Sequence, residues 1–349
     1  MAKRPDNGTP TNARAPRRSP GMVDVARLAG VSHMTVSRVI NDQPTVSQVT
    51  RQRVLAAMSE LGYRPNVAAR ALVTGRSRTL GVISVDTTLY GPASMLLAIE
   101  RAAREVDYSV SIASLPGLDR RTLRDAFDAL TSQAVEGIIA ITPHVAATAA
   151  LRHVPKDVPV VAVEGGKGPL PTVAVDQYLG ASEATRHLLS LGHRTVGHIA
   201  GPSDWYEAQE RERGWREMLV AEGREVPEVV RGDWSPRSGY AAAKQLLEER
   251  TRNVTALFVA NDQMAIGALR ALGEAGISVP RQMSLVGFDD IPEAEFFSPP
   301  LTTLRQEFGE VGRRSLELLL EQVEGAPRTR RRLVIPPQFV IRDSTASPE

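Results

Sequence analysis

The chain has 349 residues, of which 42% are apolar and none is cysteine, and its formal net charge is +2. This length predicts two or three domains with substantial cores. The lack of cysteine excludes disulfides, thiolate metal sites, iron–sulfur clusters and a catalytic thiol. No apolar run approaches the ~20 residues needed to cross a bilayer, and the basic, proline-rich start has no apolar signal segment. We therefore expect a cytoplasmic protein with no membrane partner.

Charge is distributed unevenly along the chain. Residues 1–78 contain thirteen Lys or Arg and four Asp or Glu, a net of +9, which leaves −7 for the remainder. A basic segment attached to an acidic body is typical of a nucleic-acid-binding domain joined to a ligand or partner domain. A basic disordered tail with no partner is the alternative, because charge bias alone is weak evidence.

The first ordered elements predicted are two short helices. Residues 1–20 have little to bury and indicate a disordered arm. Apolar spacing then predicts a helix from Val23 to Leu28, which Gly30 ends. Ser32 is a suitable N-cap for the second helix, and only three residues connect the two. Such a pair is a helix-turn-helix.

A third helix, capped at Ser47 or Thr50 and ended by Gly62, completes a small bundle. The apolar side chains expected to face inward are Val25, Leu28, Ala29, Val36, Val39, Ile40, Val54, Leu55, Met58 and Leu61.

In helix-turn-helix geometry the second helix enters the major groove by its N-terminal end. The candidate DNA contacts are His33, Met34, Ser37 and Arg38 at base edges, and Thr35, Ser47 and Thr50 at phosphates. Arg38 is the strongest of these because a guanidinium can make two parallel bonds to guanine. A helical bundle with a solvated polar face and no DNA is the alternative.

From Leu80 onward, short β-rich runs alternate with helical stretches, which predicts parallel sheets covered by helices. The expected strands are Leu80–Val85, Val110–Leu115, Gly137–Ile141, Val158–Val163, Val196–Ala200, Ala256–Ala260 and Ser284–Phe288. The expected helices include Ala93–Val106, Leu179–Leu191, Glu207–Ala221, Gly239–Glu249 and Met264–Ala275. This number of strands is too large for one compact sheet. We therefore expect two doubly wound lobes with a ligand cleft at the ends of the strands.

Polar residues follow three of the expected strands. They are Glu164, Asn261–Asp262 and Asp289–Asp290. Carboxylates and amides in such places can hold vicinal sugar hydroxyls, but Asp and Asn also cap the helices that follow strands. We expect capping for Asp262 and Asp290.

The N-terminal residues resemble the headpiece of the lactose-repressor (LacI) family. The resemblance runs through residues 23–32 and 35–41 and continues to Pro65-Asn66. It implies a hinge helix over residues 66–74, and nine residues are too few to hold a helix alone in water. It also implies DNA contacts at Asn41, Asn66, Ala69 and Leu72, with Leu72 as an apolar wedge in the minor groove.

The body resembles the effector-binding core of the same family, which is similar to periplasmic sugar-binding proteins, and its pattern is closest to the lactose-repressor branch. The runs that carry this resemblance are Gly201-Pro202, Arg211, Gly214-Trp215, residues 232–235, 238–240, 259–265, 286–290 and 299–303. The implied pocket residues are Leu89, Gly91, Pro92, Glu164, Arg211, Trp234, Asn261, Asp289, Gln306 and Phe308. The sequence departs from the usual pattern at Glu164, which is longer than the usual acid, at Val175, which replaces an aromatic residue, and at Met34, which replaces a polar one.

The expected fold class is α/β, with a three-helix headpiece and hinge helix followed by a two-lobed core of two doubly wound parallel sheets. The expected segments are a basic arm (1–20), a headpiece (21–65), a hinge helix and linker (66–78) and an effector core (79–345). Within the core, we expect an N-lobe from 79–177 and 308–336 and a C-lobe from 178–307 and 337–345.

The resulting hypothesis is a homodimeric, nucleoid-associated transcriptional repressor. A small sugar, with a galactoside as one candidate, would release it from a pseudo-palindromic double-stranded DNA operator. A dimer is expected because only seven residues follow Arg342, too few for a tetramerising coil. The alternatives are a corepressor-dependent regulator of the same fold and a cytoplasmic sugar-processing enzyme.

The sequence offers little support for the enzyme. Residues 165–168 lack the phosphate-loop pattern, and no Gly-x-Ser-x-Gly elbow occurs. His187, His193 and His198 do not have the pattern of a metal site. We expect no catalytic residue, no cofactor and no metal.

Overall fold

The computed structural model describes residues 20–41, 43–64, 75–115, 120–141, 143–145, 151, 157–164, 168–248 and 254–348. The chain divides into two compact units, Met1–Ser77 and Arg78–Glu349, and each is described by itself. Within the described ranges, no helix is both long enough and apolar enough to span a membrane.

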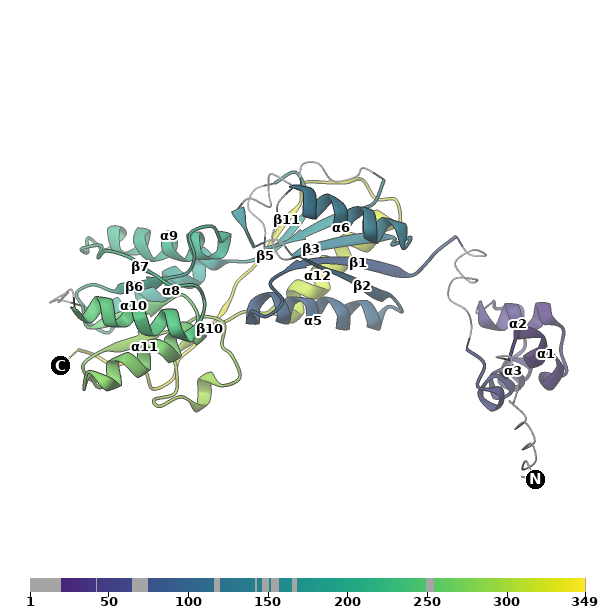
Figure 1. Ribbon diagram of the computed structural model, residues 1–349, viewed down its shortest axis with the longest axis horizontal. Coiled ribbons are helices and arrows are strands. Elements are labelled where there is room, and N and C mark those ends of the chain that lie inside the picture. The colour runs from purple at the N-terminus through teal and green to yellow at the C-terminus, as the bar shows by residue number, and fades with distance from the viewer. Residues whose placement is uncertain are drawn as a thin grey trace, which may run out of the picture. The chain divides into compact units, whose positions relative to one another are not determined.

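The first unit contains three helices, α1 (Met22–Ala29), α2 (His33–Ile40) and α3 (Gln48–Leu61) (Figure 1). Gly30 ends α1 with a left-handed backbone, at φ 63°, which a residue with a side chain adopts only at a cost. The buried residues that join the helices are Val25, Ala26, Ala29, Val36, Val39, Val54 and Ala57. The expected bundle is therefore present.

Two of the side chains predicted to face inward are exposed instead. Leu28 is 46% exposed and Leu55 is 51% exposed, whereas Ala26 and Ala57 are buried. Helices this short bury only a narrow stripe, and small alanines in that stripe let neighbouring helices approach closely. Leu28 and Leu55 lie beside the stripe, so the prediction for both was wrong.

The N-terminal lobe of the second unit contains a six-stranded sheet in which every paired neighbour is parallel. Its strands, in spatial order, are β11 (Arg332–Ile335), β5 (Thr172–Val175), β4 (Val160–Val163), β3 (Gly137–Ile141), β1 (Thr79–Val85) and β2 (Ser109–Leu115). The inner strands β3, β4 and β5 are buried along their whole length, while β2 at the edge alternates between exposed and partly buried residues. Continuous apolar runs are what a sheet covered on both faces requires.

The C-terminal lobe contains a four-stranded parallel sheet and an antiparallel strand pair. The sheet order is β7 (Val230–Arg231), β6 (Gly197–Ala200), β8 (Ala256–Val259) and β9 (Ser284–Val286), and the pair is β10 (Thr303–Arg305) with β12 (Gln338–Val340). In each sheet the first strand lies between the second and the third, which is the doubly wound arrangement. The α/β fold class predicted from the sequence, with a helical headpiece and a core of doubly wound parallel sheets, is confirmed. The predicted hinge helix lies outside the described residues.

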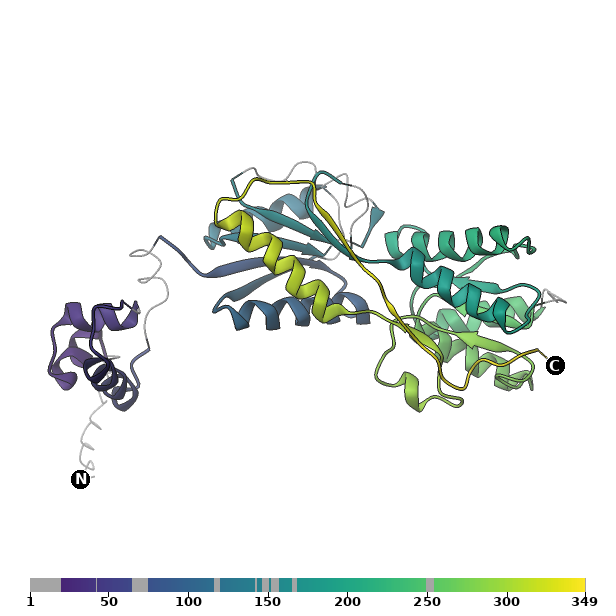
Figure 2. The ribbon, with the colours of Figure 1, turned by 180° about the vertical axis from the view of Figure 1, so that it is seen from behind.

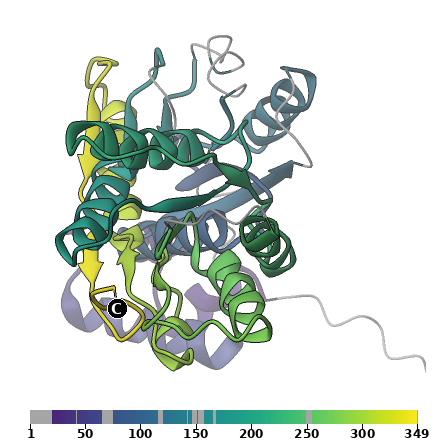
Figure 3. The ribbon, with the colours of Figure 1, turned by 90° about the vertical axis from the view of Figure 1, so that its left-hand side faces the viewer.

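Helices cover both faces of both sheets. In the N-terminal lobe, α5 (Tyr90–Glu105) packs beside α12 (Phe308–Val323), and α6 (Arg120–Ser132) belongs to the second hydrophobic cluster of that lobe (Figure 2). In the C-terminal lobe, the pairs are α8 (Gln177–Ser190) with α9 (Tyr206–Ala221), and α10 (Pro236–Glu248) with α11 (Asp262–Glu274) (Figure 3).

The described part of the chain passes between the two lobes at three places: from β5 to α8, from β10 to α12, and from β11 to β12. The first and third crossings lie together, since the backbone N–H of Asp176 donates to the carbonyl of Ile335. The first and second are joined by Gln177 Nε2, which donates to Gln306 Oε1 at 2.9 Å. Figure 2 shows the last crossing in yellow.

Five strands were not predicted: β5, β7, β10, β11 and β12. They have two to four residues each, too few to show a period of two in the sequence. Predicted strands also start or end one or two residues away from the observed bounds, as at β4 and β9. Neighbouring strands supply the hydrogen bonds that define these segments, and sequence spacing does not report them.

We predict that Gly267→Ala destabilises the C-terminal lobe. Gly267 in α11 lies against the backbone of α10, and an added Cβ would collide with the carbonyl oxygen of Pro236. Pushing the helices apart should cost about 1–3 kcal/mol of unfolding free energy. Gly273, in the same helix, has open space around it, so Gly273→Ala should be neutral or slightly stabilising. Urea unfolding of both variants checks this, and equal effects would contradict the packing described.

Candidate functional site

The second helix of the first unit carries most of the residues predicted to contact DNA. Ser32 caps it, since Ser32 Oγ accepts a hydrogen bond from the backbone N–H of Thr35 at 3.1 Å. The structure leaves His33, Met34 and Arg38 exposed, and Thr35, Ser37 and Asn41 partly exposed. The face of α2 opposite its buried valines is therefore available to a partner.

The N-terminus of α3 holds the other two predicted contacts. Ser47 is its cap, as Ser47 Oγ accepts from the backbone N–H of Thr50 at 3.3 Å and donates to Thr50 Oγ1 at 2.9 Å. A helix N-terminus with hydroxyl groups is a suitable place for a phosphate. Asn66, Ala69 and Leu72 lie outside the described residues.

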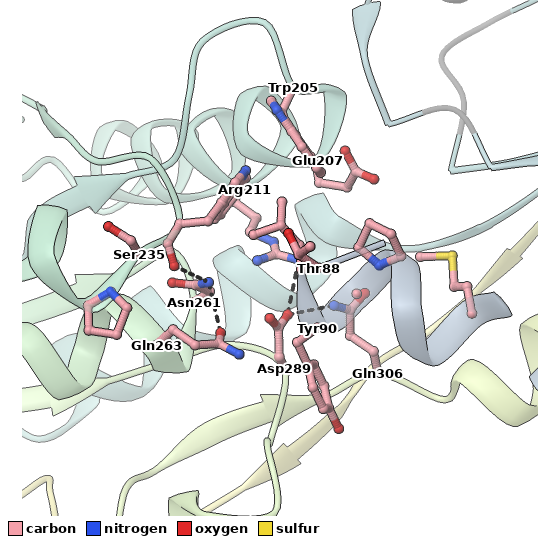
Figure 4. Close-up of a pocket in the computed structure, with 16 residues that line it drawn as sticks. Thr88, Tyr90, Trp205, Glu207, Arg211, Ser235, Asn261, Gln263, Asp289 and Gln306 are labelled. Carbon is pink, nitrogen blue, oxygen red and sulfur yellow. Dashed lines mark hydrogen bonds and ion pairs between the residues drawn. The ribbon is translucent and has the colours of Figure 1, made fainter. Parts of the chain in front are cut away.

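A pocket of about 260 Å³ lies at the strand ends of the second unit, lined by residues of both lobes (Figure 4). The structure brings together eight of the ten predicted pocket residues: Leu89, Gly91, Pro92, Arg211, Trp234, Asn261, Asp289 and Gln306. The lining residues follow β1, β6, β7, β8, β9 and β10, half of them in loops and half in the helices that come next, as expected for a doubly wound fold.

Arg211 is held from three sides. Its Nε donates to Gln177 Oε1 at 2.8 Å, a terminal nitrogen donates to the Ala260 carbonyl, and the other lies 3.4 Å from Asp289 Oδ1. Gln306 Nε2 also donates to Asp289 Oδ1, at 2.6 Å. The guanidinium and carboxylate are therefore oriented before any ligand arrives, which lowers the entropic cost of binding.

The backbone around the pocket is strained at two lining residues. Trp234 has φ 74° and Asp289 has φ 110°, values that side-chain-bearing residues seldom adopt. The Trp234 indole packs against Gly201, where any Cβ would collide with the ring. Strain of this kind persists where surrounding structure enforces it, and it gathers at binding sites.

Glu164 does not line the pocket, although we predicted that it would. Its side chain is fully buried, with Oε1 accepting from the Val175 backbone N–H at 2.7 Å and Oε2 from Gln177 Nε2 at 3.3 Å. Burial raises the pKa of Glu164 to about 7, and these two hydrogen bonds oppose the rise. The N–H at the end of β5 and the Gln177 amide hold the carboxyl group behind the pocket wall.

Phe308 is also displaced from its predicted place. It begins α12 and packs edge-to-face on Tyr90, with ring centroids 5.9 Å apart, in the core of the N-terminal lobe. Tyr90 lines the pocket and Phe308 does not. Phe308 therefore supports the wall from behind.

The predicted division between capping and ligand contact was wrong for Asp262. Asn261 caps α11, since Asn261 Oδ1 accepts from the Met264 backbone N–H at 2.9 Å, and Asn261 also lines the pocket. Asp262 instead accepts from the Ile291 backbone N–H at 2.9 Å and from the Thr303 hydroxyl at 2.7 Å. It joins the start of α11 to the loop after β9 and to β10.

Asp290 is not a cap either. Its two oxygens pair with Arg305 at 2.6 Å and Arg342 at 2.7 Å. The ion pairs connect the loop after β9 to β10 and to the C-terminal segment, partners that are distant in sequence.

The pocket includes residues that we did not predict: Thr88, Tyr90, Met95, Trp205, Glu207, Ser235, Pro236 and Gln263. Trp205 and Glu207 stand at the start of α9, in the segment that follows β6. Polar and aromatic residues after a buried strand are a signal that was applied to three other strands, and it would have indicated these two as well.

The three histidines singled out in the sequence each have local hydrogen bonds. His187 pairs with Thr345, His193 with Thr255, and His198 with the Phe258 carbonyl. Burial lowers the pKa of His198 to about 4. No group of three or more potential metal ligands occurs among the residues that the structure describes.

Comparison with known families and proteins gives consistent matches over nearly the whole chain. Residues 21–66 match the family described as bacterial regulatory proteins, lacI family, and residues 185–345 match the periplasmic binding protein-like domain. The lactose operon repressor of Escherichia coli K12 is 34% identical over 94% of this chain and 91% of its own length. The transcriptional regulator CelR of Thermobifida fusca is 36% identical over 94% of this chain and 99% of its own.

Two solved structures extend this likeness to three dimensions. The lac repressor dimer bound to operator and the anti-inducer ONPF aligns with a TM-score of 0.83 at 33% identity, covering 94% of this chain and all of that one. A CelR–cellobiose complex aligns with a TM-score of 0.68 at 33% identity, covering 93% of this chain and 99% of that one.

We predict that Glu164→Gln makes unfolding free energy less dependent on pH. In the native state the pKa of Glu164 is raised to about 7, whereas a glutamate in the unfolded chain loses its proton at about pH 4.3. The stability that this proton provides is complete below that lower value and is lost as pH rises towards 7. Glutamine cannot titrate, so the difference in unfolding free energy between the variant and the wild type should change with pH across this window.

Urea unfolding between about pH 4.5 and 7.5 measures the difference. Glu222→Gln, at an exposed position, should parallel the wild type at every pH. Parallel curves for Glu164→Gln as well would contradict a buried, protonated carboxyl group.

Proposed function

Because this chain belongs to the lacI family of bacterial regulatory proteins, we propose that it is a homodimeric transcriptional repressor that a small sugar releases from its DNA operator. The observation that carries this proposal is the pairing of a helix-turn-helix unit with a separate two-lobed unit whose pocket is lined from both lobes. The first can bind DNA and the second can sense a ligand.

The DNA-binding part of the proposal rests on the headpiece, residues 21–65, and on a hinge and linker, residues 66–78. His33, Met34, Ser37 and Arg38 would face base edges from α2, while Thr35, Ser47 and Thr50 would contact phosphates. Asn41, Asn66, Ala69 and Leu72 complete the proposed contacts. A lac repressor dimer has been solved on its operator, and a dimer of this chain would place two headpieces on two half-sites.

The effector part of the proposal rests on the composition of the pocket. Aromatic rings of Trp205, Trp234 and Tyr90 offer apolar surfaces, and Asp289, Asn261 and Arg211 offer fixed polar groups. This combination suits a sugar, which has hydroxyl groups on its rim and apolar C–H faces. Relatives have been solved with ONPG, ONPF or cellobiose, so a galactoside and a glucose disaccharide are both candidates.

Release follows from linkage. Thr88, Leu89 and Gly91 come from the N-terminal lobe and Arg211 and Asn261 from the C-terminal lobe, so a ligand between them contacts both. A sugar that prefers one arrangement of the lobes shifts the population towards it. If that arrangement separates the two hinges of the dimer, DNA affinity falls by the same coupling free energy. No catalytic step is needed, and the protein would act in the cytoplasm, where its operator lies.

We predict that Arg38→Ala relaxes base preference at one position in each half-site. Loss of a bidentate guanine contact should reduce discrimination there by about 1–3 kcal/mol. Arg51→Ala removes a positive charge from α3 and should weaken binding to every DNA sequence by the same factor. A binding assay on a randomised operator library measures both. Unchanged base preference in Arg38→Ala would contradict the proposed position of α2 in the major groove.

We predict that a sugar raises the melting temperature of the wild type and that Gly91→Leu abolishes the shift. A ligand at a hundred times its dissociation constant should stabilise by about 2.7 kcal/mol. Gly91 lines the pocket in the first turn of α5, and a Cβ there meets open space. Leucine should therefore occupy the pocket without disturbing the fold.

A thermal-shift screen against a panel of sugars, followed by operator release, checks this. Gly273→Leu places the same side chain at another open helical glycine, one that does not line the pocket, and should respond as the wild type does. A normal sugar response in Gly91→Leu would mean that the effector binds elsewhere.

A further inference from the structure

Glu207 is a buried carboxyl group in the pocket wall that lacks a full set of partners. It lies in the first turn of α9, is 6% exposed and lines the pocket, and its Oε2 has no hydrogen-bond partner. Buried polar atoms in folded proteins nearly always have a partner. An unpaired acceptor at a ligand pocket therefore indicates a group that the ligand supplies.

The charged residues around Glu207 do not supply that group. Arg211, one turn along α9, directs its nitrogens to Gln177, Ala260 and Asp289. Glu164, behind the wall, and Asp289, opposite, are both acids, and each raises the pKa of Glu207. No ion pair of Glu207 occurs within the described ranges.

This environment favours the protonated form of Glu207. Burial raises the pKa of Glu207 well above its ordinary value, with Glu164 adding to the rise and Arg211 opposing it. A neutral carboxyl group both donates and accepts hydrogen bonds. It can therefore bind a hydroxyl group without the cost of burying an unpaired charge.

A second unpaired atom in a residue that lines the pocket points to the same class of ligand. Trp234 Nε1 is a buried donor with no partner, and Trp234 also lines the pocket. An ammonium group could satisfy Glu207 but has no acceptor to offer an indole N–H. A polyhydroxylated ligand supplies both a donor for Glu207 and an oxygen for Trp234.

We propose that Glu207 is a specificity-determining residue of the pocket, which selects effectors that place an uncharged hydroxyl group against its carboxyl group. This inference rests on the proposed sugar response and adds the chemistry that decides among sugars. Sugars that lack a hydroxyl group at that position leave Glu207 unpaired and bind more weakly.

The test compares two substitutions of Glu207 by calorimetric titration at pH 7 with neutral mono- and disaccharides, including cellobiose and ONPG. Glu207→Gln keeps a neutral donor and acceptor of the same shape and should bind within about threefold of the wild type. Glu207→Leu keeps the volume without a polar atom and should bind at least about tenfold more weakly. Leucine also removes an unpaired buried group, so the variant is expected to fold.

The control is Glu217→Leu on the same helix, where the side chain is 51% exposed and outside the pocket lining. It should bind as the wild type does. Wild-type affinity in Glu207→Leu would overturn the role of Glu207 and leave the sugar response intact. An equal loss in both Glu207 variants would overturn the hydroxyl assignment, because it would show that a charge is required. Binding of no sugar by the wild type, with operator binding unaffected, would overturn the proposed sugar response and this inference with it.

Discussion

The buried guanidinium of Arg211 is the constraint on which the second unit depends. A charge removed from water must be paired and hydrogen-bonded, and here Gln177, Ala260 and Asp289 do this together. Gln177 follows the first crossing between the lobes, and Gln306, which also bonds Asp289, follows β10. The network that orients the pocket therefore passes through the segments that connect the lobes. A ligand that contacts Arg211 also acts on the parts of the chain that set the lobe arrangement.

The first unit has the opposite character. Its core contains seven buried residues, four valines and three alanines, and its helices have eight, eight and fourteen residues. Such a small core stabilises weakly, so caps such as Ser32 and Ser47 contribute a large share of what holds the helices. The function of this core is to hold α2 in place. Val36 and Val39 anchor the helix, and its opposite face stays exposed. A basic surface on a small rigid unit suits DNA, whereas the acidic body does not.

Sequence reasoning was most successful where short-range physics decides the outcome. The cap at Ser32, the ends of α1 and α3 at Gly30 and Gly62, and the alternation of strands and helices all follow from local propensity and period. It was less successful where partners distant in sequence determine the position and role of a side chain. Asp262 and Asp290 have the composition of caps, but Thr303 and Arg342, 41 and 52 residues away, hold them instead. The same holds for Glu164, which Val175 and Gln177 turn away from the pocket.

The pocket residues that the sequence indicated and those that it missed differ in a physically meaningful way. Arg211, Asp289 and Asn261 were indicated, and each already has hydrogen bonds within the protein. These bonds orient the three side chains before a polar ligand binds. Because the side chains keep these partners whichever sugar is bound, they discriminate weakly among sugars. Strong discrimination requires a buried group that is left unpaired by the wrong ligand. Glu207, which the sequence did not indicate, has that property, so the identity of the effector depends more on this residue than on the residues by which the pocket was first located.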